Sequence, residues 1–170
     1  MKAELFRKVG QPERGFSVVM RAASVCFRAR LGTGLWGAVG GLANILNSLG
    51  EYVSAKRLSE AVLPQALEGG DNLLIGTLYS HLADAYMGLA DPALTSSSDT
   101  KSSSNLNVAK AELYIDHARE RYKRAGYVVG ECEQVMKRAV IARLRGDGGV
   151  AEVWAQRYGR VWEEGMGGGE

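Results

Sequence analysis

The sequence predicts an all-α fold, an α-solenoid of about seven helices that stack in pairs along a right-handed superhelix. Two observations favour this fold class. Residues with high helix propensity dominate the chain, and no alternating run of Val, Ile and Thr marks a strand. In addition, an alanine recurs shortly after a turn at three places, Ala55, Ala111 and Ala151. A regular recurrence over about 40 residues is typical of a helical repeat array.

The first gap between these alanines exceeds the second because it contains a Ser/Thr-rich segment at 91–105, DPALTSSSDTKSSSN. That composition buries too little apolar surface to hold a fixed structure, so we expect a disordered loop. Without the segment, both gaps are about 40 residues long. We therefore predict one solenoid domain over 1–165, a fragment of a longer array, followed by a disordered Gly-rich tail at 166–170.

Three helices are expected in the first part of the chain. The first, near 12–30, opens with Pro12, whose fixed φ suits a first helical turn, and it ends before two glycines. The second, near 35–48, stops at a further glycine. The third, near 52–68, carries Pro64 late, where a proline should kink the helix or end it early.

Four more helices complete the prediction, and each ends at a residue that breaks helices. The fourth, near 72–90, stops before an Asp-Pro pair, and the fifth, near 106–124, follows the Ser/Thr-rich segment. The sixth, near 128–145, is ended by a Gly-Asp-Gly-Gly run. The seventh, near 150–163, precedes the Gly-rich tail.

The helix pairs fit a tetratricopeptide repeat, in which small residues mark the place where two helices cross closely. The best unit contains Leu82-Ala83-x-x-Tyr86 in its first helix and Ala111 in its second. The last unit matches least well because Arg138 stands where a leucine is expected. HEAT and armadillo repeats have periods of about 40–47 residues and are the alternative, but the small-residue positions favour the tetratricopeptide interpretation.

Two features suggest chemistry at first sight. The segment GTGLWG (32–37) matches the Gly-rich fingerprint of dinucleotide-binding enzymes, which requires a preceding strand. Since 12–30 has helical apolar spacing, we interpret the glycines as an inter-repeat turn. His81 with Asp84, and His117 alone, lack the spacing of a metal or catalytic motif, so we interpret the histidines as structural. No catalytic residue, cofactor or metal is expected, and the chain is not predicted to be an enzyme.

What remains is a binding surface, because the first helices of stacked pairs line a concave groove. The residues expected to face this protein-binding groove are Asn44, Asn47, Thr77, Ser80, Asp84, Met87, Met136, Val140 and Arg143. The two asparagines offer paired donors and acceptors for the backbone of an extended peptide. A clamp for a carboxylate would need several basic side chains here, and only Arg143 qualifies, so no such clamp is predicted.

Charge and hydropathy limit the partners further. The net charge of +2 gives no argument for nucleic acid, and the nine Lys/Arg against five Asp/Glu of 106–145 are spread along helices as solvated faces. No apolar run is long enough to span a membrane. Cys26 and Cys132 are expected to be buried free thiols of an intracellular protein. Exposed terminal helices of a solenoid could also self-associate.

Several blocks of the chain resemble a known family. The most specific are AVLPQALEGGD (61–71) and RLRGD (143–147), within longer blocks at 15–31, 35–71 and 109–147. Together with YSHLADAYMGLA, they resemble the C-terminal tetratricopeptide region of subunit 5 of the anaphase-promoting complex, in its fungal form.

The resemblance implies a non-catalytic scaffold in a cullin–RING ubiquitin ligase that acts in the cell cycle, during mitosis and cell division. It also implies partners among the platform subunits 1, 4 and 15, and a place in the nucleus and cytoplasm. The alternative is a tetratricopeptide adaptor of co-chaperone or cargo type that captures peptides in the groove.

Overall fold

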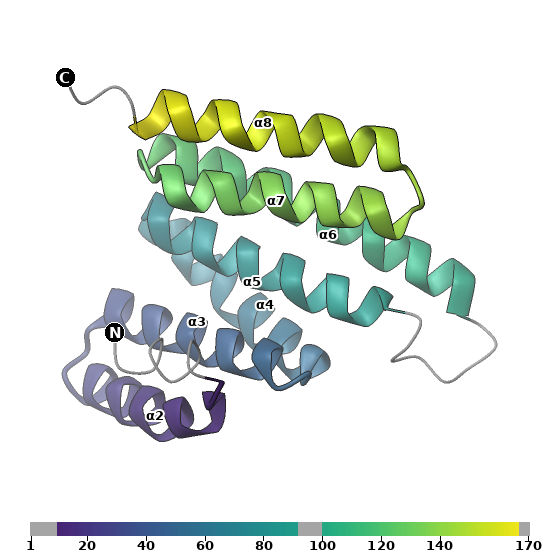
Figure 1. The fold of residues 1–170 in the computed structure, drawn as a ribbon. Helices are drawn as coiled ribbons and strands as arrows, with labels where there is room; N and C mark the ends of the chain where they lie inside the picture. Colours follow the sequence, from purple (N-terminus) through teal and green to yellow (C-terminus); the bar gives the residue numbers. More distant parts are fainter. Residues whose placement is uncertain (1–9, 92–99, 167–170) are drawn as a thin grey trace.

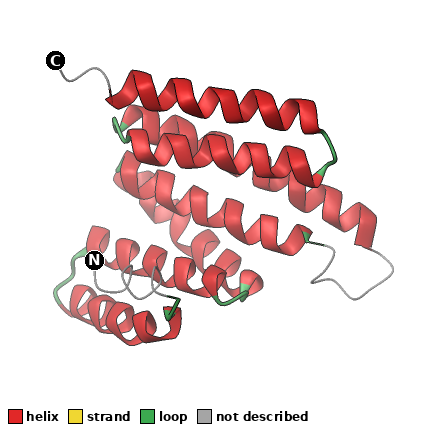
Figure 2. Ribbon diagram, in the orientation of Figure 1, coloured by secondary structure: helices red, strands yellow, loops and turns green. Residues whose placement is uncertain are grey.

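The computed structural model describes residues 10–91 and 100–166, and within them it contains seven helices and no strand (Figure 2). The helices are α2 (Pro12–Arg28), α3 (Gly32–Ser48), α4 (Tyr52–Gly69), α5 (Asn72–Ala90), α6 (Thr100–Arg124), α7 (Val128–Leu144) and α8 (Gly148–Met166). The predicted all-α fold class is confirmed, and every predicted helix is present.

The helices stack in chain order, from α2 at the bottom of Figure 1 to α8 at the top. Each helix packs against the next one along the chain, and α3 also packs against α5. This arrangement of neighbours is that of a helical solenoid. The pairs α3–α4, α5–α6 and α7–α8 correspond to the three complete repeats expected from the sequence.

The recurring alanines lie where the helices of each pair meet. Ala55 and Ala111 are fully buried, and Ala151 is 3% exposed. Ala111 belongs to the main core cluster together with Leu82 and Tyr86, which come from the facing helix α5. A larger side chain at such a position would separate the two backbones, so the period read in the sequence marks close helix packing.

Four inter-helix turns share one geometry. In each, a backbone N–H donates over 2.9 Å to the carbonyl five residues earlier: Leu31 to Cys26, Glu51 to Leu46, Tyr127 to Tyr122 and Asp147 to Ala142. The residue before each donor has a positive φ, and these residues are Arg30 (55°), Gly50 (80°), Gly126 (68°) and Gly146 (78°). Three of the four turns use glycine, as this helix ending favours.

Arg30 therefore explains why the predicted start of the second helix, near residue 35, was wrong. The first turn needs no glycine, and α3 begins at Gly32 rather than at 35, so GTGLWG lies inside the helix and not in an inter-repeat turn. A Cβ atom on Gly34 would lie 2.9 Å from Sγ of Cys26, so this glycine lets α2 and α3 approach closely. Cys26 is half-buried rather than buried, whereas Cys132 is buried as expected.

Two other boundaries also differ from the sequence-based expectation. Helix α6 begins at Thr100, so 100–105 is helical, and the rest of the expected loop at 92–99 lies outside the described residues. Ser104 and Asn107 hold this start of α6 by donating to the last carbonyls of α5, at Ala90 (2.8 Å) and Leu89 (3.1 Å). These bonds satisfy backbone carbonyls that the end of α5 leaves unpaired. The polar residues at the start of α6 therefore stabilise the helix rather than a loop.

Helix α4 continues through Pro64 as far as Gly69. The residues on either side of the proline pack against α5, where Ala66 is fully buried beside Ile75 and Leu78. This packing outweighs the hydrogen bond that a proline cannot donate. The expected tail overlaps α8 by one residue, since this helix ends at Met166, and 167–170 lies outside the described residues.

Candidate protein-binding cleft

A cleft of about 390 Å³ opens where α3, α5 and the start of α7 meet, and we call it the central cleft. Its lining comprises Gly37, Gly41, Asn44, Thr77, Ser80, His81, Asp84, Tyr122, Tyr127 and Glu133. Four residues of the predicted groove, all on α3 and α5, therefore face one hollow. Two glycines of α3 form one wall, which leaves the backbone of that helix accessible from the cleft.

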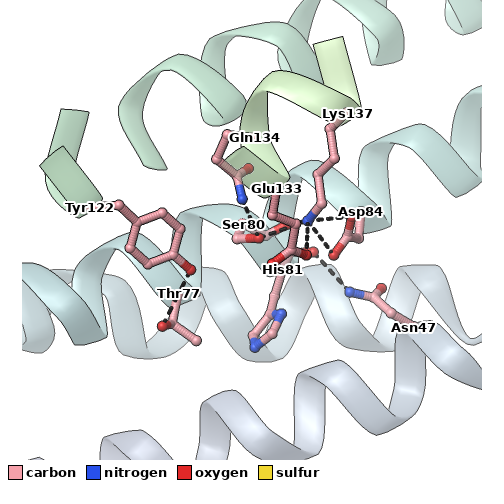
Figure 3. A network of polar contacts seen from close by, with 9 residues as sticks. All are labelled: Asn47, Thr77, Ser80, His81, Asp84, Tyr122, Glu133, Gln134 and Lys137. Atoms are coloured by element: carbon pink, nitrogen blue, oxygen red, sulfur yellow. Dashed lines mark hydrogen bonds and ion pairs between the residues drawn. The ribbon is translucent and has the colours of Figure 1, made fainter. Parts of the chain in front are cut away.

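Lys137 of α7 is the centre of the polar contacts beside this cleft (Figure 3). Its ammonium lies 2.7 Å from Oγ of Ser80, 2.7 Å from Oδ1 of Asp84 and 3.3 Å from Oε1 of Glu133. The lysine side chain is only 12% exposed, and that of Asp84 is 32% exposed. A shielded ion pair of this kind is stronger than one on the open surface, so it fixes α7 against α5.

Gln134, one turn before Lys137, joins the same network from the interior. Its Nε2 donates to Oγ of Ser80 over 3.1 Å, and the residue is fully buried. Its Oε1 accepts no hydrogen bond from the described residues. Ser80 thus receives two donors from α7, which sets the register between α5 and α7.

The two predicted asparagines have different roles. Asn44 lines the central cleft, as expected of a residue that contacts a peptide. Asn47 donates from Nδ2 to the backbone carbonyl of His81 over 2.9 Å, and therefore ties α3 to α5. The expected pair of peptide-gripping amides is thus one cleft residue and one residue that holds the helices together.

Tyr122 closes the cleft from α6. Its hydroxyl donates to Oγ1 of Thr77 over 3.4 Å, and the side chain is almost fully buried. Burial raises the pKa of Tyr122 to about 12, because removal from water disfavours the phenolate. The side chain therefore stays a neutral hydrogen-bond donor throughout the physiological pH range.

The other four predicted groove residues do not line the cleft. Met87 packs against the main core, and Arg143 is exposed. Met136 and Val140 are 45% and 42% exposed on the outward side of α7. Lys137, directly after Met136, is the residue that the sequence interpretation missed. The signal for it is Asp84, four residues after Ser80 on the predicted face, because a carboxylate that is shielded from water requires a cation.

The histidines have structural surroundings. His81 is 9% exposed, and its neighbour on the same face, Asp84, is engaged by Lys137. His117 stacks on Tyr79 with 5.2 Å between the ring centroids. Among the described residues, no group of three or more His, Cys, Asp or Glu is arranged to hold a metal ion. No helix in the described ranges is long and apolar enough to cross a membrane.

Arg138 shows how the weakest repeat position is accommodated. In place of apolar packing it makes ion pairs with Glu112, at 3.0 Å, and with Asp116. Its guanidinium also lies over the Trp154 ring, 5.6 Å from the centroid. Arg145 adds a 2.8 Å ion pair to the same Glu112. Charged contacts thus join α6, α7 and α8 where a repeat of this kind normally uses leucine.

Comparison with known proteins yields no family. No protein-family model matches the chain, and no curated protein matches it.

Proposed function

We propose that this chain is a non-catalytic scaffold subunit of the anaphase-promoting complex and holds platform subunits together for cell-cycle-regulated ubiquitination in the nucleus and cytoplasm. The observation that carries the proposal is an apolar stripe formed by Phe16, Met20 and Phe27 of α2 and by Leu31 in the turn that follows. Their exposed fractions are 42%, 46%, 72% and 55%. We call this set the α2 stripe.

The α2 stripe has the character of a protein interface. Phe16, Met20 and Phe27 are spaced by four and seven residues, which places them on one face of α2, and Leu31 follows in the turn after this helix. Two aromatic rings in one exposed patch are costly in water, and aromatic residues supply much of the binding energy in protein interfaces. Helix α2 lies at one end of the described helix stack (Figure 1), where a neighbouring subunit would extend the array.

The resemblance of 61–71 and 143–147 to subunit 5 names the candidate partners, platform subunits 1, 4 and 15. The test is a pull-down of each purified platform subunit by the full chain. The double variant Phe16→Asp/Phe27→Asp should lose capture, while Leu113→Asp, on the exposed side of α6, should keep it. Circular dichroism of each variant checks that the helices remain. Failure of the folded wild-type chain to capture any of the three would overturn the proposal.

A second candidate, a peptide-binding adaptor, is favoured by the central cleft. Its lining offers the Asn44 amide, hydroxyls and the carboxylates of Asp84 and Glu133, which suit a peptide backbone or a basic side chain. We expect Asn44→Ala to weaken the binding of an extended peptide. Asn105→Ala, on the exposed start of α6, is the matched control. Equal affinity of both variants and the wild type would exclude the cleft as the peptide site.

A further inference from the structure

A second cleft, of about 530 Å³, lies between α6, the start of α7 and α8, and we call it the basic cleft. Arg119 and Lys123 of α6 lie on one side, and Arg157 and Arg160 of α8 lie on the other. In each pair the spacing of three or four residues places both side chains on the same helix face. Two cationic pairs therefore line one hollow, although the sequence suggested only solvated faces along α6.

The four cations outnumber the two carboxylates of the lining, Glu131 and Glu164, and only Arg119 makes an ion pair with a described residue. Arg119 makes a 3.1 Å ion pair with Glu131, which also lines the cleft. Lys123 and Arg160 make no ion pair with any described residue, and Arg157 lies over the Trp154 ring, 5.2 Å from the centroid. The stacked arginine is held in place without losing its charge. Like charges gathered in a hollow raise the local potential more than the same charges spread over a convex surface.

Two further features add to the anion-binding character of the basic cleft. Helix α7 begins here, at Val128, and no side chain caps its first turn. Its unpaired N–H groups add partial positive charge at this end. Val128, Val153 and Val161 contribute apolar lining, and Val153 is 59% exposed.

From this combination we propose that the basic cleft binds an acidic segment of a partner protein, with Asp or Glu side chains on the cations and an aliphatic side chain on the valines. Nucleic acid fits less well, because the valines in the lining offer no ring for base stacking, whereas they can pack against an aliphatic side chain. This surface is separate from both the α2 stripe and the central cleft, so the inference goes beyond the proposed function.

Fluorescence anisotropy with the full chain tests the proposal. The probe is a fluorescein-labelled peptide of alternating Glu and Val, and the comparison peptide alternates Gln and Val. The variant Lys123→Glu/Arg160→Glu reverses two cleft charges that make no ion pair or ring contact with a described residue. The control variant Arg21→Glu/Arg57→Glu makes the same change in net charge at two exposed arginines on α2 and α4.

We expect the wild type and the control variant to bind the Glu peptide, with weaker binding at higher salt. The cleft variant should bind at least about tenfold more weakly. Equal loss in both variants would overturn the proposal, because it would indicate attraction to net charge alone. Equal affinity of the wild type for the Gln peptide and the Glu peptide would overturn it as well. So would displacement of the Glu peptide by a single-stranded oligonucleotide at the same concentration of negative charge.

Discussion

The ammonium of Lys137 lies 2.7 Å from a carboxylate oxygen of Asp84, and this ion pair joins α7 to α5 beside the central cleft. The same lysine reaches Ser80, so one side chain of α7 holds two successive turns of α5. Because α5 and α7 belong to different helix pairs, the contact connects two repeats. The stacking of the solenoid thus depends on polar groups as well as on its apolar core.

We predict that Lys137→Met destabilises the fold by about 2 kcal/mol. The substitution keeps a chain of similar length but leaves the Asp84 carboxylate without its donor, and Ser80 keeps only the hydrogen bond from Gln134. Urea unfolding followed by circular dichroism measures the change. The control is Arg124→Met, which removes an ion pair with Glu120. The side chains of Arg124 and Glu120 are each 56% exposed. That pair should contribute less than about 0.5 kcal/mol, and equal effects of the two substitutions would contradict the role given to Lys137.

A second prediction concerns the close crossing of α5 and α6 at Ala111. Ala111→Leu should destabilise the fold by about 1–3 kcal/mol, because the added atoms meet a filled core around Leu82 and Tyr86. Thermal unfolding gives the measurement. Ala109→Leu lies on the exposed side of the same helix and changes helix propensity equally, so it should have little effect. A tolerated leucine at 111 would show that the small residue is not required for packing.

The helices were predictable because their apolar spacing and their turn residues agree. Glycines at 50, 126 and 146 occupy the positive-φ position of three turns, and each marked a helix end in the sequence. Arg30 occupies the same position without any such mark, so the boundary of α3 was placed too late. At the start of α6, the polar side chains of Ser104 and Asn107 bond across to α5. The amino-acid composition of the segment does not predict such a tertiary contact.

The central cleft was predictable only in part. Repeat register placed Asn44, Ser80 and Asp84 on one surface, and the structure brings these three together. The same register led to Met136 and Val140 on α7, where the structure instead turns Lys137 toward α5. A rotation of α7 by one residue about its axis is enough for this difference. Such a rotation depends on side-chain packing between repeats, which a periodic pattern does not encode.

The raised pKa of Tyr122 predicts a loss of stability in alkaline solution. The unfolded tyrosine releases its proton near pH 10.0, whereas the folded one keeps it to about 12. Between these values the folded state binds the extra proton, so the free energy of unfolding falls as pH rises, by up to about 3 kcal/mol. Tyr122→Phe removes this ionisable group. The free energy of unfolding, measured with urea, should therefore fall less steeply between pH 10.0 and 12 in the variant than in the wild type.

Near pH 7 the wild type and Tyr122→Phe should differ much less, since the hydrogen bond to Thr77 is long at 3.4 Å. Burial also raises the pKa values of Tyr86 and Tyr114. Both tyrosines are present in the wild type and in the variant, so they lower the free energy of unfolding at alkaline pH in both proteins. An alkaline curve of the same steepness for both proteins would show that the Tyr122 hydroxyl ionises as freely in the folded state as in the unfolded one.

The turn at Arg30 offers a substitution that should stabilise the chain. Arg30 has a φ of 55°, in the left-handed region that costs a residue with a Cβ atom about 1–2 kcal/mol, and the three turns with the same hydrogen bond use glycine there. We expect Arg30→Gly to raise the free energy of unfolding by about 0.5–1 kcal/mol, after the greater backbone freedom of glycine in the unfolded chain is included. Ala29→Gly is the control, because Ala29 has a φ of −82° and gains nothing from glycine. It should lower stability, and a loss in both variants would show that the turn conformation of Arg30 carries no strain to relieve.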